Sequence, residues 1–122
     1  VMLSAGASFV ARGYPMKLDH LADLMARAIR HEGFALLDVL QPCVTFNNTY
    51  DLYNRTVDEL ESMPASLEES LSVVRRTDRL AIGVMRQVSA APHHRLLQGD
   101  RIPVTTRGSV AQRVAAVREI LA

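Results

Sequence analysis

Cysteine is scarce in this sequence: Cys43 is the only one among 122 residues. An intrachain disulfide is therefore excluded. A secretory signal, which would show a basic stretch followed by a long apolar one, is not visible either, so we expect a cytoplasmic protein. No apolar run approaches the roughly 20 residues that span a bilayer, and we expect no membrane segment.

An excess of charge of one sign is also missing. The 14 basic and 13 acidic residues nearly cancel, which removes the electrostatic reason to expect nucleic acid or an anionic membrane as a partner. A hydrophobic content of 48% is near the globular norm, and the length allows one domain with a modest core. The chain begins inside apolar sequence, at Val1-Met2-Leu3, which we interpret as typical of a piece of a longer polypeptide.

The first half of the sequence has the pattern of a βαβ unit. Residues 8–12 predict a short strand, and residues 16–31 predict a helix whose apolar stripe recurs at helical spacing. Residues 34–40 form a nearly continuous apolar run, which is typical of a strand covered on both faces. Two such strands joined by a helix should be parallel. The predicted stripe consists of Leu18, Leu21, Met25, Ala28 and Ile29.

The second half predicts a helix over 49–61, a second helix that begins at Ser66 and ends near 78, and a strand over 80–88. Residues 89–107 are interpreted as a loop, and Ser109 as the cap of a final helix.

Two charged residues of the first half are given structural roles: Asp38 as a buried carboxylate with satisfied hydrogen bonds rather than a catalytic base, and Arg12 as a member of an ion pair.

Cys43 is the residue that best fits a chemical role, because it follows a proline where a buried strand turns outward. Functional groups in such sheets lie beyond the carboxyl ends of strands. From its position alone the thiol is a packed side chain, an iron ligand or a nucleophile. A nucleophile would also need a base within reach. A zinc site formed by Cys43 with the adjacent His93 and His94 is a weaker alternative, because neighbouring histidines on an extended loop point apart.

Several segments occur in an order that resembles a known family. These are Ala5-Gly6-Ala7-Ser8-Phe9-Val10-Ala11-Arg12-Gly13, then Leu18-Asp19-His20-Leu21, and then the long string from Gly33 to Asn47 that contains Asp38-Val39-Leu40-Gln41-Pro42-Cys43-Val44-Thr45-Phe46-Asn47, followed by Tyr50-Asp51-Leu52-Tyr53. They resemble the C-terminal part of the thiamine-diphosphate-binding beta subunit of 2-oxoacid:ferredoxin oxidoreductases, closely over residues 3–55 and more weakly at Leu80–Val84.

The resemblance implies the oxidative decarboxylation of a 2-oxoacid to an acyl-CoA, with ferredoxin as electron acceptor. It implies thiamine diphosphate, magnesium and a four-iron four-sulfur cluster as cofactors of the complete enzyme, and an alpha subunit as partner. Cys43 matches the cysteine that supplies the last ligand of that cluster. Thr45 and Asn47 are polar neighbours that we expect to donate hydrogen bonds to cluster sulfurs and so to raise the potential.

Other motifs of the family are missing from these residues, namely its Cys-x-x-Cys pair and its Gly-Asp-Gly segment. We therefore expect no complete cofactor site and no activity in the isolated chain. The expected fold is α/β, an incomplete parallel-sheet core of the thiamine-diphosphate-binding fold with additional C-terminal helices. Residues 1–55 would form its βαβ core, and residues 56–122 a divergent helical region with one strand near 80–88.

Two rival interpretations remain open. One is a non-catalytic α/β interaction module, derived from that family, that binds a partner or a second copy through an open sheet edge. The other is a cysteine-dependent enzyme, whose activity would be lost when Cys43 is replaced by serine.

Overall fold

The computed structural model describes residues 1–99 and 108–121, apart from the side chain of Ile120. The chain divides into two compact units, Val1–Pro92 and His93–Ala122, and each is described by itself.

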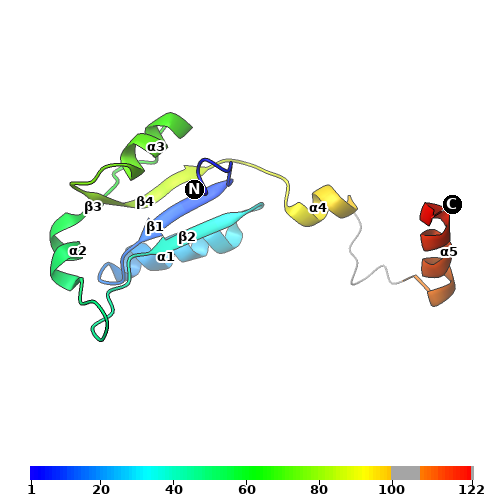
Figure 1. Cartoon of the computed structure of the whole chain (residues 1–122). Helices are drawn as coiled ribbons and strands as arrows, with labels where there is room; N and C mark the ends of the chain where they lie inside the picture. The colour runs from blue at the N-terminus through cyan, green and yellow to red at the C-terminus, as the bar shows by residue number, and fades with distance from the viewer. Residues whose placement is uncertain (100–107, 122) are drawn as a thin grey trace. The chain divides into compact units, whose positions relative to one another are not determined.

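The first unit is built on a four-stranded sheet in the order β2-β1-β4-β3 (Figure 1). The strands are β1 (Phe9–Gly13), β2 (Ala35–Val39), β3 (Val57–Glu59) and β4 (Leu80–Gln87). β1 and β2 are parallel and joined by a helix, so the predicted βαβ unit is confirmed, as is the α/β class. β4 runs antiparallel to β1 and parallel to β3, so the sheet is mixed rather than wholly parallel. Side-chain alternation marks a strand but does not encode its direction.

Helix α1 (Leu18–Arg30) covers one face of the sheet, where Leu24 packs with Phe9, Ala11 and Val84. The approach of helix and strand is close, because a Cβ atom added to Gly13 would lie 2.5 Å from Cδ1 of Leu21.

The predicted apolar stripe of α1 is only partly the face that it buries. Leu21 and Leu24 are buried and Ala28 packs against the cluster that contains Leu24, whereas Leu18, Met25 and Ile29 are exposed. The helix is apolar along two adjacent lines, and the period of the sequence alone does not tell which line meets the sheet.

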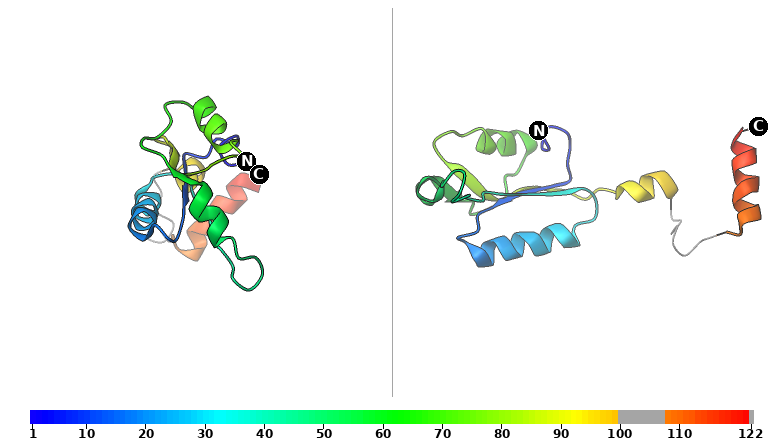
Figure 2. Two further views of the ribbon diagram at one scale, coloured as in Figure 1. Left: turned by 90° about the vertical axis from the view of Figure 1, so that its left-hand side faces the viewer. Right: turned by 60° about the horizontal axis from the view of Figure 1, so that its bottom comes forward.

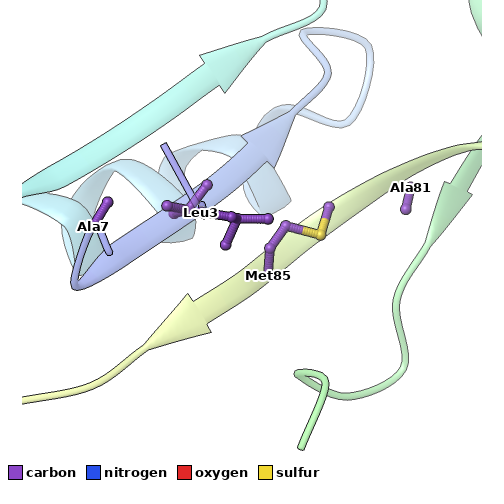
Figure 3. Close-up of a cluster of buried hydrophobic side chains, with 5 residues drawn as sticks. Leu3, Ala7, Ala81 and Met85 are labelled. Atoms are coloured by element: carbon purple, nitrogen blue, oxygen red, sulfur yellow. The ribbon is translucent and has the colours of Figure 1, made fainter. Parts of the chain in front are cut away.

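The opposite face of the sheet carries helix α3 (Leu67–Val74), which packs on β4, and the N-terminal segment (Figure 2). Figure 3 shows the buried cluster on this side, in which Leu3 and Met85 lie next to each other. The cluster consists of Leu3, Ala7, Val10, Ala81 and Met85. Ser66 caps α3 as predicted, since its Oγ accepts a hydrogen bond from Glu69 N at 3.0 Å. The helix ends at Val74, a few residues before the predicted end.

The segment predicted as a helix over 49–61 divides into two elements. Helix α2 spans Tyr50–Thr56, and β3 begins at Val57 and pairs with Leu80–Ile82 of β4. The prediction of a longer helix was wrong because pairing with β4 overrides the weak local preference of these residues. The region from 56 onward thus contains a second strand besides the expected one near 80–88.

The second unit contains α4 (His93–Gln98) and α5 (Val110–Leu121). The loop predicted over 89–107 therefore contains a short helix, and its residues 100–107 lie outside the described part of the chain. The predicted final helix is confirmed, and Ser109 Oγ accepts a hydrogen bond from Gln112 N at 3.3 Å. Within residues 1–99 and 108–121, no helix is both long and apolar enough to cross a bilayer.

Candidate functional site

The candidate site is the loop that leaves the carboxyl end of β2. Its start is fixed to the neighbouring strand, because Leu40 N donates a hydrogen bond to Gly13 O at 2.9 Å. Pro42 is buried and Cys43 is exposed immediately after it. The predicted position of the thiol, beyond the carboxyl end of a strand, is confirmed at β2.

Residues 43–47 form a tight turn that begins at Cys43 and ends at Asn47. Asn47 N donates to Cys43 O at 2.8 Å, and Cys43 N donates to Asn47 O at 3.3 Å. The turn brings successive backbone N–H groups to the same side as the thiol. Such groups create a concave site that favours negative charge.

The electrostatics of the turn act on the Cys43 thiol. The backbone N–H groups of Phe46 and Thr45, and more weakly that of Asn47, lower the pKa of the thiol, against a smaller opposing effect of desolvation. The thiolate is the form that binds metals and attacks electrophiles. The loop therefore presents an accessible sulfur that is predisposed to carry negative charge.

The expected hydrogen bonds from Thr45 and Asn47 to cluster sulfurs stay a prediction, and the structure shows another effect of these two residues. It is their backbone N–H groups that stabilise the thiolate, together with that of Phe46. Phe46 was not among the predicted site residues, because a backbone N–H carries no signal in the residue type. Only the turn geometry places these groups at the sulfur.

Buried aromatic contacts hold the next element, α2, to the end of β1. Tyr14 is buried, and its hydroxyl donates a hydrogen bond to Asn54 Oδ1 at 2.8 Å. Its ring meets that of Tyr53 edge-on, with ring centroids 5.9 Å apart. Burial raises the pKa of Tyr14, so the hydroxyl stays a donor at neutral pH. The cysteine loop is thus attached to the folded core at both ends.

The two histidines of the first unit have other contacts. His31 Nε2 lies 2.9 Å from Ser8 Oγ, and His20 Nε2 lies 3.9 Å from Glu59 Oε1. In the described parts of the chain, no group of three or more His, Cys, Asp or Glu side chains is placed to hold a metal ion. The role of Cys43 as a metal ligand stays a prediction.

The ion pair expected of Arg12 is present, with Arg12 Nε 2.8 Å from Asp38 Oδ2. Asp38 was expected to be buried, but its side chain is 48% exposed. The expectation was wrong because β2 lies at the edge of the sheet, where its carboxylate reaches solvent.

A second cluster of polar side chains, on the α1 side of the sheet, was not predicted from the sequence. Lys17 Nζ donates to Glu59 Oε2 at 2.8 Å, and this hydrogen bond is the main cause of a lowered pKa for Glu59, with His20 contributing less. Lys17 and Glu59 are 42 residues apart in the sequence, so no local pattern could have revealed their contact.

Comparisons with known proteins give a consistent result, although no family model matches the chain. A 2-oxoacid:ferredoxin oxidoreductase subunit beta from Saccharolobus solfataricus is 43% identical over 104 residues, which are 84% of this chain and 32% of that protein. The protein of the same name from a Sulfolobus species is 38% identical over 104 residues, with the same shares. In Aeropyrum pernix, subunit beta of 2-oxoacid:ferredoxin oxidoreductase 1 is 43% identical over 65 residues, which are 52% of this chain and 20% of that one.

A solved structure is similar as well. It is described as 2-oxoglutarate:ferredoxin oxidoreductase from Magnetococcus marinus with 2-oxoglutarate, coenzyme A and succinyl-CoA bound. The match has a TM-score of 0.77 and 26% sequence identity, and it covers 95% of this chain and 42% of the other. The chain thus spans about a third of the length of the first two relatives, with 32% of each matched.

Proposed function

We propose a function from the family to which this chain belongs, that of the beta subunits of 2-oxoacid:ferredoxin oxidoreductases, as the resemblance predicted. In this proposal the chain is the part of such a subunit that supplies one ligand of its iron–sulfur cluster. The complete enzyme converts a 2-oxoacid and coenzyme A into an acyl-CoA and passes the electrons to ferredoxin. Thiamine diphosphate and magnesium carry the carbon chemistry, and a four-iron four-sulfur cluster carries the electrons.

One observation carries this proposal: an exposed thiol, in a chain homologous to these subunits, whose pKa is lowered by the backbone N–H groups of its own turn. Hydrogen bonds to cluster sulfurs set the reduction potential of such centres. The turn around Cys43 provides these donors next to the ligating atom. A packed structural cysteine would be buried in apolar surroundings instead, with a raised pKa.

The activity belongs to a larger assembly. A four-iron four-sulfur cluster takes four thiolates, and this sequence has one cysteine. The remaining ligands, the diphosphate site and the alpha subunit must come from elsewhere. The exposed apolar side chains of Leu18, Met25 and Ile29 along α1 support contact with further polypeptide, since such surface is usually covered in an assembly.

The experiment that tests the proposal is a chimera. The 104 aligned residues of the Saccharolobus solfataricus beta subunit are replaced by the corresponding residues of this chain, and the product is reconstituted with iron and sulfide under anaerobic conditions. We expect the visible absorption and the reduced-state paramagnetic resonance of a four-iron four-sulfur cluster. In the Cys43→Ala variant we expect loss of most of the cluster, because one of its four ligands is gone.

A matched control is Val44→Ser, which changes the neighbouring side chain, also exposed, and leaves the thiol and the backbone N–H groups in place. This variant should bind iron as the unmodified chimera does. If the Cys43→Ala chimera held a full cluster of unchanged potential, the assignment of Cys43 as a ligand would be wrong.

A second function is favoured by one feature of the sheet. β2 lies at its edge, and an edge strand offers unpaired backbone groups to another chain. A non-catalytic interaction module would use that edge. It predicts that the chain binds a partner polypeptide equally well with and without Cys43, whereas the oxidoreductase proposal predicts that cluster assembly depends on Cys43.

A further inference from the structure

The first residues of the chain have the hydrogen bonding of a helix end. Ala5 N donates to Val1 O at 2.9 Å, which is one turn of α-helix. Ala7 N then donates to Met2 O at 3.0 Å and Gly6 N to Leu3 O at 3.1 Å, while Gly6 has a φ of 83°. This pair of bonds around a left-handed glycine is the Schellman motif, which terminates α-helices.

A single turn is not stable as a helix by itself, because nucleation costs more than one hydrogen bond returns. Here the turn is attached to the core by Leu3, which is 4% exposed and packs in the cluster with Val10 and Met85 (Figure 3). Val1, by contrast, is 98% exposed. The turn thus has the geometry of a helix end, and Leu3 is its contact with the core.

The N-terminal turn borders a groove of about 420 Å³ on the face of the sheet opposite α1. Val1, Met2 and Leu3 form part of its lining. Its apolar lining includes Leu36 of β2, Val10 of β1 and Val74 of α3, and the paired Arg12 and Asp38 also line it.

Coverage of the two sheet faces is unequal. α1 packs on β1, β2 and β4, whereas α3 on the opposite face packs on β4. Parallel strands are normally covered by helices on both faces, and β2 carries leucine toward both, at Leu36 and Leu37. A helix over β1 and β2 on the groove side would complete the layer.

We propose that the groove binds an amphipathic α-helix whose C-terminal turn is Val1–Ala5. This helix belongs to polypeptide that corresponds to the part of the relatives that this chain does not match. This inference rests on the proposed function, because the relatives contain the unmatched length, 68% of each by difference from the 32% matched. The helix enters with an apolar face against Leu36 and Val74 and ends at Gly6.

The test measures whether the groove is accessible, and it uses single cysteines as probes. In a Cys43→Ala background, Leu36→Cys reports on the groove and Leu52→Cys reports on the exposed surface of α2. The chain is compared with and without an N-terminal extension of about 20 residues, a helix of roughly 30 Å, taken from the Saccharolobus solfataricus beta subunit directly before its aligned region.

We expect the extension to slow maleimide labelling at Leu36→Cys by about tenfold or more, and to leave labelling at Leu52→Cys unchanged. Val74→Cys, on the other wall of the groove, is the second probe if Leu36→Cys does not fold. Unchanged labelling at the groove probe in a folded, extended chain would overturn the proposal. Protection that appears in the unextended chain as its concentration rises would overturn it as well, because a second copy would then be the occupant.

No iron, thiamine diphosphate or active enzyme enters this measurement. A failure of the groove proposal therefore leaves the role of Cys43 untouched. Conversely, a chimera that holds a full cluster without Cys43 would disprove that role and leave the labelling result standing.

Discussion

At the scale of single residues, the turn around Cys43 explains how an exposed cysteine can be predisposed for chemistry without a charged neighbour. The stabilising groups are the backbone N–H groups of Phe46, Thr45 and Asn47. Because the backbone supplies them, the effect depends on the conformation of the turn, which the mutual hydrogen bonds of Cys43 and Asn47 hold closed.

The pKa of Cys43 should therefore rise when the chain unfolds. A lowered pKa means that the thiolate, the reactive form, is present at lower pH in the folded chain than in the unfolded one. We expect the pH profile of alkylation by iodoacetamide to lie at lower pH in buffer than in urea. In urea the thiol should have the pKa of an ordinary cysteine, about 8.5. Coincident profiles in buffer and urea would show that the turn does not stabilise the thiolate.

At the scale of elements, a buried hydroxyl group links α3 to the sheet beside the apolar contacts of that helix. The register between β1 and β4 shifts at Val10 and Ala11, which pair with Arg86 and Val84, so Met85 is left without a partner on β1. Ser70 Oγ donates to Met85 O at 2.6 Å, and Ser70 is 2% exposed. The helix thus supplies a hydrogen-bond donor to the one residue that the register shift leaves without a partner on β1.

Ser70→Ala should destabilise the fold by about 1–3 kcal/mol, because the Met85 carbonyl group would stay buried without its donor. Ser72→Ala is the control on the same helix. Ser72 is exposed, and its replacement changes helix propensity by a similar amount without removing a buried hydrogen bond. Urea unfolding followed by circular dichroism measures both. Equal free energies of unfolding for the two variants would contradict the role given to Ser70.

The elements also show which features the sequence can reveal. The βαβ unit and the position of Cys43 beyond β2 follow from periodicity, because a buried strand and an amphipathic helix have distinct repeats. β3 spans only Val57–Glu59, too short to show a repeat, and its partner lies more than 20 residues away. The contact of Lys17 with Glu59 and the donors around the sulfur likewise arise from tertiary structure, which no local pattern encodes.

At the scale of the whole molecule, the chain combines a packed α/β unit with a single thiol, which we propose as one ligand of an iron–sulfur cluster. Its first unit has two buried apolar clusters on opposite faces of one sheet. The proposed chemistry would need further residues, because the sequence has one cysteine and matches 32% of each of two relatives.

The isolated chain should therefore bind neither a four-iron four-sulfur cluster nor thiamine diphosphate with magnesium. A four-iron four-sulfur cluster needs four thiolates, and magnesium on a diphosphate needs several oxygen ligands fixed together. One sulfur satisfies neither requirement, and residues 1–99 and 108–121 contain no group of three potential metal ligands. Calorimetric titration with thiamine diphosphate and magnesium should give no specific heat. Anaerobic incubation with iron and sulfide should leave no chromophore after desalting, whereas the chimera should retain one. Tight magnesium-dependent binding by the chain alone would show that its site is more complete than one thiolate allows.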